Sequence, residues 1–420
     1  MKKIGLFLGA GPEDGGMYQY SLAMLSALED LPAEEYSLVV AYADPNWRER
    51  ISRHNAAGVA VRWGKIARIL AVVPAFLPVS YPRWGLTLAR VTGWADDLMQ
   101  QGCSLWVFPR QEVWSAMFPL PVLGAVHDLM HRYEPHFPEA SGYGRYRCRD
   151  AYLCSLCQNA RGILVDSEIG KRQVEESYGT PAGRVFVLPY IPPAYLSHRE
   201  GNTGFENTDF GNGDAENTDF EITDLENTDL ENNDFEKRYQ LPPKYVFYPA
   251  QFWEHKNHVR LIHAIAEVRK DIPDICLALV GSRNNGNAAA HREVKKLGIE
   301  RQIRFAGYVP ERDMAKFYRR ARALVLPTLF GPTNIPPLEA FALGCPVAVS
   351  GIYGMPEQVG DAGLLFDPYS VESMAGTIRQ LWVDDDLCER LRTRGRARAA
   401  AWGPDQFARA LHRIIEQLTC

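Results

Sequence analysis

The chain has 420 residues, 46% of them hydrophobic and 23% charged. This composition excludes disordered and collagen-like proteins and suits two globular domains of roughly 150 to 200 residues each. Its formal net charge is −5, but the charges are unevenly distributed along the chain: residues 201–236 contain twelve Asp or Glu and no Lys or Arg. The rest of the chain is therefore mildly basic, which suits phosphate-bearing substrates or an anionic membrane surface but not a nucleic-acid partner.

Short apolar strands alternate with longer helical patterns in both halves of the chain, as is typical of parallel sheets covered by helices. Strands are expected at 4–8, 38–41, 105–108, 122–126, 162–165 and 185–188 in the first half. The second half repeats the pattern at 245–248, 276–280, 303–306, 323–326, 346–349 and 364–366. The sequence therefore predicts an α/β fold class with two Rossmann-like, doubly wound domains.

A glycine-rich loop, G-A-G-P-E-D-G-G, follows the first expected strand at 9–16. Asp14 stands where the dinucleotide fingerprint G-x-G-x-x-G needs its third glycine, and no acidic residue clearly follows at the distance that reads a ribose. A dehydrogenase is therefore disfavoured. The pair Gly15-Gly16 suits either a tight turn or a backbone that approaches a ligand closely.

Residues 50–95 contain no Asp or Glu. They carry seven basic residues and three tryptophans: Arg50, Arg53, Arg62, Lys65, Arg68, Arg83, Arg90, Trp63, Trp84 and Trp94. The apolar run 69–79 is too short to span a bilayer. The composition suits a tryptophan-bearing surface on anionic lipid headgroups, and equally a helix pair with solvated arginines. On the first hypothesis, changing Arg62, Lys65 and Arg68 to Gln reduces binding to anionic vesicles.

Cysteine and histidine patterns do not indicate a metal site. Cys154 and Cys157 form a C-x-x-C inside a predicted helix without a second ligand pair, so we interpret them as packed thiols. His127, Asp128 and His131 lack a distant further ligand, and we predict no bound metal. The low cysteine density and the absence of a signal-peptide pattern after Met1 lead us to expect a reducing cytoplasm.

A five-residue repeat fills residues 201–235, between the two halves of the chain. In another register it resembles the pentapeptide-repeat solenoid. Seven imperfect copies would make under two coils with little core and many like charges, so we favour an acidic linker that is dispensable for catalysis.

The segment 326–347, L-P-T-L-F-G-P-T-N-I-P-P-L-E-A-F-A-L-G-C-P-V, leads from a strand through a loop into a helix that begins at prolines. Such a helix start offers free amides and positive partial charge to an anion. Taken alone, Glu339 in its first turn also suits a cap or a carboxylate that complements the helix dipole.

This segment resembles the donor-binding motif of the retaining glycosyltransferases of family four, which have the GT-B fold. The resemblance implies that Glu339 holds the ribose hydroxyls of a nucleotide and that the donor contacts Thr333, Asn334 and Ile335. Gly331 stands where the family commonly has an acidic residue, so the carboxylate that contacts the sugar hydroxyls is missing.

Further segments are similar to the same family. V-F-Y-P-A-Q-F-W-E-H-K-N-H at 246–258 resembles its G-R-L-x-x-x-K-G signature: Lys256 matches the Lys that grips the diphosphate, and Gln251 replaces the Arg. Gly15 and Gly16 resemble its N-terminal loop, which approaches the donor phosphates and the acceptor. The G-A-V-H-D-L segment at 124–129 implies a hydrogen bond from His127 to a sugar hydroxyl. Residues 351–368 and 402–418 resemble the end of the family's second domain and its last helix.

The resemblance implies a domain plan. An acceptor-side domain covers 1–195, the insert 196–237 and the nucleotide-sugar-binding domain 238–402. A final helix at 403–420 crosses back to the first domain.

The implied activity is a metal-independent retaining hexosyltransferase without a further cofactor, with His127, Lys256 and Glu339 as catalytic residues. A mannose-like sugar would move from a nucleotide diphosphate to a saccharide or lipid-linked saccharide, as in bacterial cell-surface glycan synthesis. We expect peripheral contact with the inner face of the plasma membrane. A nucleotide-sugar epimerase of the same fold and an inactive glycan- or partner-binding homologue remain alternatives.

Overall fold

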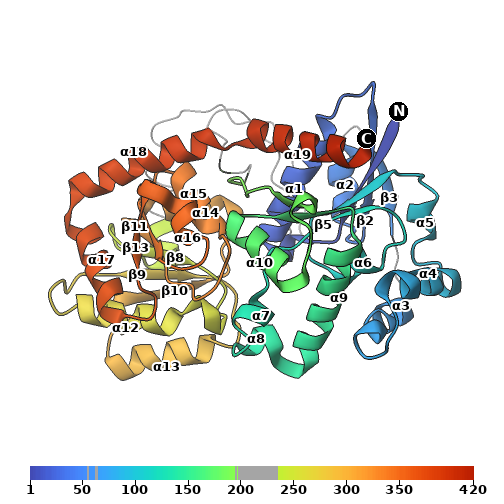
Figure 1. Cartoon of the computed structure of the whole chain (residues 1–420). Coiled ribbons are helices and arrows are strands. Elements are labelled where there is room, and N and C mark those ends of the chain that lie inside the picture. Colours follow the sequence, from blue (N-terminus) through green and yellow to red (C-terminus); the bar gives the residue numbers. More distant parts are fainter. Residues whose placement is uncertain (54–55, 62–64, 194–195, 197–234) are drawn as a thin grey trace, which may run out of the picture.

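The structure is a computed structural model that describes residues 1–53, 56–61, 65–193, 196 and 235–420. Two parallel sheets, each flanked by helices, lie next to one another along the molecule (Figure 1). The predicted α/β fold class with two Rossmann-like, doubly wound domains is confirmed. The expected changes at Arg62 and Lys65 concern side chains outside the described residues.

The first domain contains a seven-stranded sheet in which every described pair is parallel, with the order β3-β2-β1-β4-β5-β6-β7. Its strands are β1 (Lys2–Leu8), β2 (Tyr36–Tyr42), β3 (Ala57–Ala60), β4 (Leu105–Phe108), β5 (Val122–Ala125), β6 (Gly162–Val165) and β7 (Val185–Val187). The order reverses between β1 and β4. Ligands of open parallel sheets bind beyond the carboxyl ends of strands at such a reversal.

The second domain contains a six-stranded parallel sheet with the order β10-β9-β8-β11-β12-β13. Its strands are β8 (Val246–Pro249), β9 (Leu277–Val280), β10 (Ile303–Gly307), β11 (Ala323–Leu326), β12 (Val347–Ser350) and β13 (Gly363–Phe366). The order reverses between β8 and β11, and the two loops that resemble donor-binding motifs follow these two strands. The tertiary structure therefore places both motifs at the ligand-binding edge of this sheet.

Every expected strand is present, with ends within two residues of the prediction. The sequence analysis missed β3. This strand reads A-G-V-A, lies at the edge of the sheet and is mostly exposed, so it lacks the continuous apolar run of a buried parallel strand.

The helices that cover the sheets have the following bounds. Those of the first domain are α1 (Gly16–Glu29), α2 (Trp47–Ser52), α3 (Lys65–Leu70), α4 (Tyr81–Thr92), α5 (Asp96–Met99), α6 (Val113–Met117), α7 (Met130–Tyr133), α8 (Pro138–Ser141), α9 (Arg145–Asn159) and α10 (Glu168–Tyr178). Those that follow are α12 (His258–Val268), α13 (Asn287–Leu297), α14 (Glu311–Arg320), α15 (Ile335–Ala342), α16 (Met355–Val359), α17 (Val371–Val383), α18 (Asp385–Ala401) and α19 (Pro404–Thr419).

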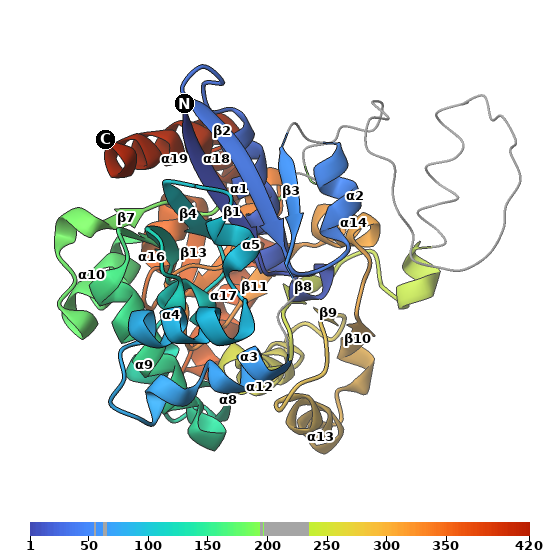
Figure 2. The ribbon, with the colours of Figure 1, turned by 90° about the vertical axis from the view of Figure 1, so that its right-hand side faces the viewer.

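Helices α18 and α19 run along one side of the molecule from the second domain to the first (Figure 1), and the C-terminal end of α19 lies near the N-terminus in both views (Figure 2). The carboxylate of Asp384 caps α18 by accepting a hydrogen bond from the backbone N of Leu387. The apolar face of α19, including Phe407 and Leu411, is buried in the core of the first domain. No helix in the described part of the chain is long and apolar enough to cross a membrane.

The five-residue repeat lies outside the described residues, except for its last residue. Phe235 is buried, and its ring packs against those of Tyr239 and Phe317, with centroids 5.2 and 5.0 Å away. The core of the second domain therefore includes a residue that lies before the expected boundary at 238.

Candidate active site

The loop after β8 places Lys256 at the edge of the second domain. Lys256 is half-buried, and its Nζ donates a hydrogen bond to Asn334 Oδ1 at 3.0 Å. Burial lowers the pKa of this amine to about 8, although the carboxylates of Asp128 and Glu139 oppose the shift. Both carboxylates belong to the first domain, so Lys256 faces the interdomain cleft.

Asn257 fixes the backbone next to Lys256. Its φ of 61° lies in the left-handed region, which Asn adopts more readily than most residues with a Cβ. Its Nδ2 donates to the carbonyls of Pro327 and Pro368 at 3.0 and 2.9 Å, which ties the loop after β8 to the end of β11. The sequence analysis did not single out this residue.

Replacing Asn257 with Ala is expected to lower the free energy of unfolding by about 3 kcal/mol. Two buried hydrogen bonds contribute about 1 kcal/mol each, and the left-handed backbone costs Ala about 1 kcal/mol more. Asn257→Gly removes the hydrogen bonds without the strain and should lose about 2 kcal/mol. Urea unfolding measures both, and equal losses in the two variants would contradict the role of the backbone.

The loop after β11 brings together the predicted donor-binding residues of the second domain. Asn334 caps α15, and its backbone N and O both bond to the side-chain amide of Gln358, at 3.0 and 2.6 Å. The backbone amides of Thr333 and Ile335 have no partner in the described part of the chain. They are therefore the amides at this helix start that an anion can engage. Glu339, one turn later, accepts a hydrogen bond from the hydroxyl of Tyr318.

At Gly331, where the family commonly has an acidic residue, a neighbouring side chain occupies the space that a larger residue would need. A Cβ at this position would lie 2.6 Å from Nδ2 of Asn334, closer than carbon and nitrogen normally approach. The side chain that orients Lys256 therefore occupies the space beside this glycine. A carboxylate there would require Asn334 to move.

Gln251, the residue at the place of the family's arginine, is exposed. Its Oε1 accepts hydrogen bonds from Trp253 Nε1 at 2.9 Å and Asn284 Nδ2 at 3.3 Å. Its amide nitrogen has no partner among the described residues, so a phosphate oxygen could accept from it.

The glycine-rich loop of the first domain meets the start of α15. A Cβ on Gly16 would lie 2.6 Å from Cδ1 of Ile335, so the absence of a side chain allows this close approach. Gly15 has a φ of 57° and is the N-cap of α1. Arg110 holds the loop by donating to Asp14 Oδ2 at 2.7 Å and to the carbonyl of Gly9 at 3.0 Å.

His127 follows β5 and lines a pocket, but both of its ring nitrogens have protein partners. Nε2 lies 2.6 Å from the carbonyl of Pro109, to which it donates, and Nδ1 accepts from the hydroxyl of Tyr190 at 2.7 Å. Burial lowers the pKa of the ring, which favours the neutral form with its proton on Nε2. A sugar hydroxyl would have to compete with Pro109 for that proton.

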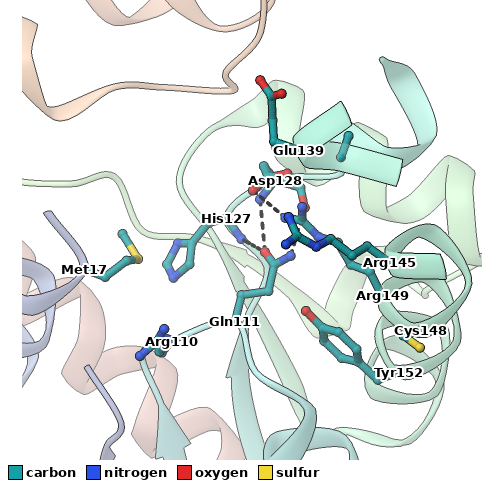
Figure 3. A pocket seen from close by; sticks show the side chains of 11 residues that line it. Met17, Arg110, Gln111, His127, Asp128, Glu139, Arg145, Cys148, Arg149 and Tyr152 are labelled. Atoms are coloured by element: carbon teal, nitrogen blue, oxygen red, sulfur yellow. Dashed lines mark hydrogen bonds and ion pairs between the residues drawn. The ribbon is translucent and has the colours of Figure 1, made fainter. Parts of the chain in front are cut away.

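The pocket has a volume of about 550 Å³ and is lined entirely by the first domain (Figure 3). Asp128 accepts from Arg149 at 2.7 Å, and the side chain of Gln111 accepts from the backbone N of both His127 and Asp128. Burial alone would raise the pKa of Asp128, but Arg149 and the hydrogen bonds lower it. The pocket therefore presents an ion pair and polar groups that suit a hydroxylated ligand.

Glu139 of α8 joins the pocket to the loops that follow β8 and β9 in the second domain. It accepts hydrogen bonds from the backbone N and the Nδ1 of His255, at 3.0 and 2.6 Å, and from Asn285 Nδ2 at 2.8 Å. Burial would raise the pKa of Glu139, but these hydrogen bonds hold it at about 2. The sequence analysis missed Glu139, whose partners lie more than 100 residues further along the chain.

The geometry does not support a zinc site at His127, Asp128 and His131. His131 pairs with Asp150 at 3.3 Å, and Asp128 pairs with Arg149. No group of three His, Cys, Asp or Glu in the described residues is placed to hold a metal ion. Cys154 and Cys157 on α9 are free thiols.

A second contact across the cleft joins Asp166, after β6, to Thr333, whose hydroxyl donates to Oδ2 at 2.6 Å. Burial raises the pKa of Asp166 from 3.8 to about 7, although the hydroxyls of Thr333 and Ser167 oppose the shift. As pH rises, Asp166 loses its proton at a lower pH in the unfolded chain than in the folded one. The folded state therefore loses stability as pH rises from 3.8 to about 7.

We expect Asp166→Asn to raise Tm more at pH 8 than at pH 5, because Asn removes the cost of the buried charge. Thermal unfolding at the two pH values measures the difference, with Asp274→Asn as an exposed control. An equal gain in Tm at pH 5 and pH 8 would contradict a buried charge at Asp166.

Comparisons with known proteins agree with this geometry. Residues 229–398 match the family of glycosyl transferases, group 1. The O-antigen chain mannosyltransferase B of Escherichia coli is 34% identical over 168 residues, which are 39% of this chain and 43% of that protein. A D-inositol 3-phosphate glycosyltransferase of Corynebacterium jeikeium is 31% identical over 38% of this chain and 40% of its own length. The matched segment thus spans about two fifths of these relatives.

Solved structures match over nearly the whole chain. Sucrose-phosphate synthase from Thermosynechococcus elongatus has a TM-score of 0.71 at 19% identity, covering 100% of this chain and 99% of that one. WaaG, a glycosyltransferase involved in lipopolysaccharide biosynthesis, has a TM-score of 0.66 at 15% identity, covering 98% and 99%. The two facing parallel-sheet domains thus define a GT-B protein. The match of residues 229–398 to the group 1 glycosyl transferases agrees with the resemblance of the second domain to family four.

Proposed function

We propose that this chain transfers a hexose from a nucleotide diphosphate to an acceptor bound in the pocket of the first domain, with retention at the anomeric carbon. One observation carries the proposal. Lys256 is held by Asn334 beside the free amides at the start of α15, at the point where Gly16 approaches Ile335 from the opposite domain. Positive charge is thereby fixed where a diphosphate would depart.

The reaction breaks the bond between the anomeric carbon and the diphosphate oxygen and forms one to an acceptor hydroxyl oxygen. The acceptor attacks from the face that the diphosphate leaves, and the hydroxyl proton passes to the departing phosphate oxygen. No protein nucleophile is required. Lys256 and the amides of Thr333 and Ile335 stabilise the charge that develops on the leaving group.

We propose that Glu339 orients the nucleotide by accepting hydrogen bonds from its ribose, with Gln251 as a neutral donor to the diphosphate. His127 borders the pocket on the side of the cleft and would contact the sugar. Because Lys256 and the helix start supply the positive charge, we propose that no divalent metal is needed.

A mannose-like sugar is favoured because the relatives include an O-antigen chain mannosyltransferase and a serotype-specific mannosyltransferase. The acceptor we propose is a saccharide or lipid-linked saccharide of a cell-surface glycan, made at the cytoplasmic face of a membrane. Its hydroxyls would contact the Asp128–Arg149 pair.

The test is a thermal-shift screen of the purified chain against a panel of nucleotide sugars, since a donor stabilises the folded state by mass action. The stabilising donor is then incubated with saccharide acceptors, with and without EDTA. We expect a glycoside product in both conditions. An isomerised donor formed without acceptor would indicate the epimerase instead, stabilisation without turnover a binding homologue, and activity restored only by manganese a metal-dependent transferase.

A further inference from the structure

The region 66–91 of the first domain exposes an unusual amount of apolar surface. Five large side chains on α3 and in the segment that follows it are 43% to 69% exposed: Ile66, Ile69, Val72, Phe76 and Leu77. Leu86 on α4 is exposed as well. We call these six side chains, with Arg68, Arg83 and Arg90, the α3–α4 surface. Helices α3 and α4 pack against one another, and exposed apolar groups gathered in one region mark an interaction site in a soluble protein.

The α3–α4 surface is rigidly supported from beneath. Trp84 Nε1 donates to the carbonyl of Leu70 at 2.8 Å, and Arg147 of α9 donates to the carbonyl of Ala75 at 2.7 Å. Gly85 brings α4 close to α6, because a Cβ there would lie 1.9 Å from the carbonyl of Met117. Trp94 is buried. The expectation of a tryptophan-bearing surface is therefore wrong for Trp94, which is buried, whereas Trp84 is half-buried.

The charge of the α3–α4 surface indicates the kind of partner that it contacts. Arg68 lies on α3, while Arg83 and Arg90 share a stripe of α4 with Leu86, and all three are exposed. Among the described residues none of them forms an ion pair, and residues 50–95 contain no carboxylate. An apolar centre with basic residues and no acidic ones complements the headgroups and upper acyl chains of an anionic bilayer.

The surface adjoins the acceptor pocket through α9. Arg147 supports the α3–α4 surface, whereas Arg149 and Tyr152 of the same helix line the pocket. Tyr81, the first residue of α4, lies close enough to Tyr152 to interact electrostatically with it. Figure 1 shows α3 and α4 at the outer edge of the first domain, away from α19.

We infer that the α3–α4 surface binds the protein to an anionic lipid bilayer. Bound in this way, the protein presents its pocket to the head group of a lipid-linked acceptor that stays in the membrane. The choice of acceptor rests on the proposed function, whereas the lipid contact does not.

The experiment is co-sedimentation of the full chain with vesicles of phosphatidylcholine alone or mixed with phosphatidylglycerol. We expect binding only to the anionic vesicles, weakened by salt. Arg68→Gln/Arg83→Gln/Arg90→Gln should reduce partitioning on the order of a hundredfold. Arg390→Gln/Arg409→Gln/Arg413→Gln changes the net charge equally on α18 and α19 and should reduce it little.

A second variant separates apolar from ionic contact. Ile69→Ser/Phe76→Ser should lower partitioning about tenfold or more with an unchanged Tm, because both side chains are exposed. Equal binding to both kinds of vesicle, binding to neither, or equal loss in the two arginine variants would overturn the inference. If the chain binds anionic vesicles but no nucleotide sugar stabilises it, the proposed function fails and the lipid contact stands. If a nucleotide sugar stabilises the chain but the chain does not bind vesicles, only the lipid contact is overturned.

Discussion

Lys256→Ala is expected to lower kcat for sugar transfer about a hundredfold or more. Removal of one pre-organised group that stabilises developing negative charge has an effect of this order. Alanine also leaves Oδ1 of Asn334 without the hydrogen bond from Nζ. Because Lys256 acts on charge that grows as the bond breaks, kcat should fall more than KM rises.

The pH dependence gives this prediction a second test. Burial lowers the pKa of Lys256 to about 8, and only its protonated form carries the charge that the leaving group needs. The protonated fraction declines as pH rises through this value, so kcat/KM should fall above about pH 8, reporting the free enzyme. Lys270→Ala, which removes an exposed lysine of the same domain, is the control. Unchanged kcat in Lys256→Ala would contradict the proposed mechanism.

Glu139→Ala is expected to lower kcat/KM about a hundredfold by weakening closure of the two domains. Glu139 accepts three hydrogen bonds from the second domain, and hydrogen bonds to a charged group contribute about 1.5 to 3 kcal/mol each. Loss of two of them suffices to shift the equilibrium between closed and open forms about a hundredfold. The variant should therefore also show a larger radius of gyration in small-angle X-ray scattering.

The matched control is Glu293→Ala, which removes a Glu–His pair that lies within the second domain. It should change neither turnover nor the radius of gyration. The pKa of Glu139 is held near 2, below its usual 4.5, so its contribution is complete above pH 4.5 and lost as pH falls toward 2. If Glu139→Ala loses activity but keeps the compact form, Glu139 acts on the substrate rather than on closure.

The two loops that resemble donor-binding motifs could be placed from the sequence because their signals are local. Lys256 lies in the loop that follows β8, and Glu339 lies in the helix that follows β11. The sequence pattern places each strand, its loop and the next helix. The same locality explains why every expected strand is present. Asn257 was missed although its signal was present: it stands where the family has Gly, and its backbone has a positive φ.

The contacts of the first-domain pocket and of the cleft could be found only in the tertiary structure, because they join distant segments. Glu139 meets His255 across 116 positions, Asp166 meets Thr333 across 167, and His127 meets Tyr190 across 63. No periodicity or spacing in the sequence relates such pairs. Each side chain on its own is consistent with a solvated surface residue.

Some local patterns were also decided only by packing. The sequence shows tryptophans and arginines together in residues 50–95, but it does not tell which of them face outward. In the structure α4 packs closely on α6 at Gly85, Trp94 is buried and Trp84 half-buried, whereas isoleucine, phenylalanine and arginine side chains are exposed. The sequence by itself determined the two-domain fold and the positions of the two loops that resemble donor-binding motifs, since strand periodicity and loop composition are properties of neighbouring residues. The direction of each side chain, the closure of the cleft and the partners of His127 were decided by the tertiary structure, because they depend on which helices meet.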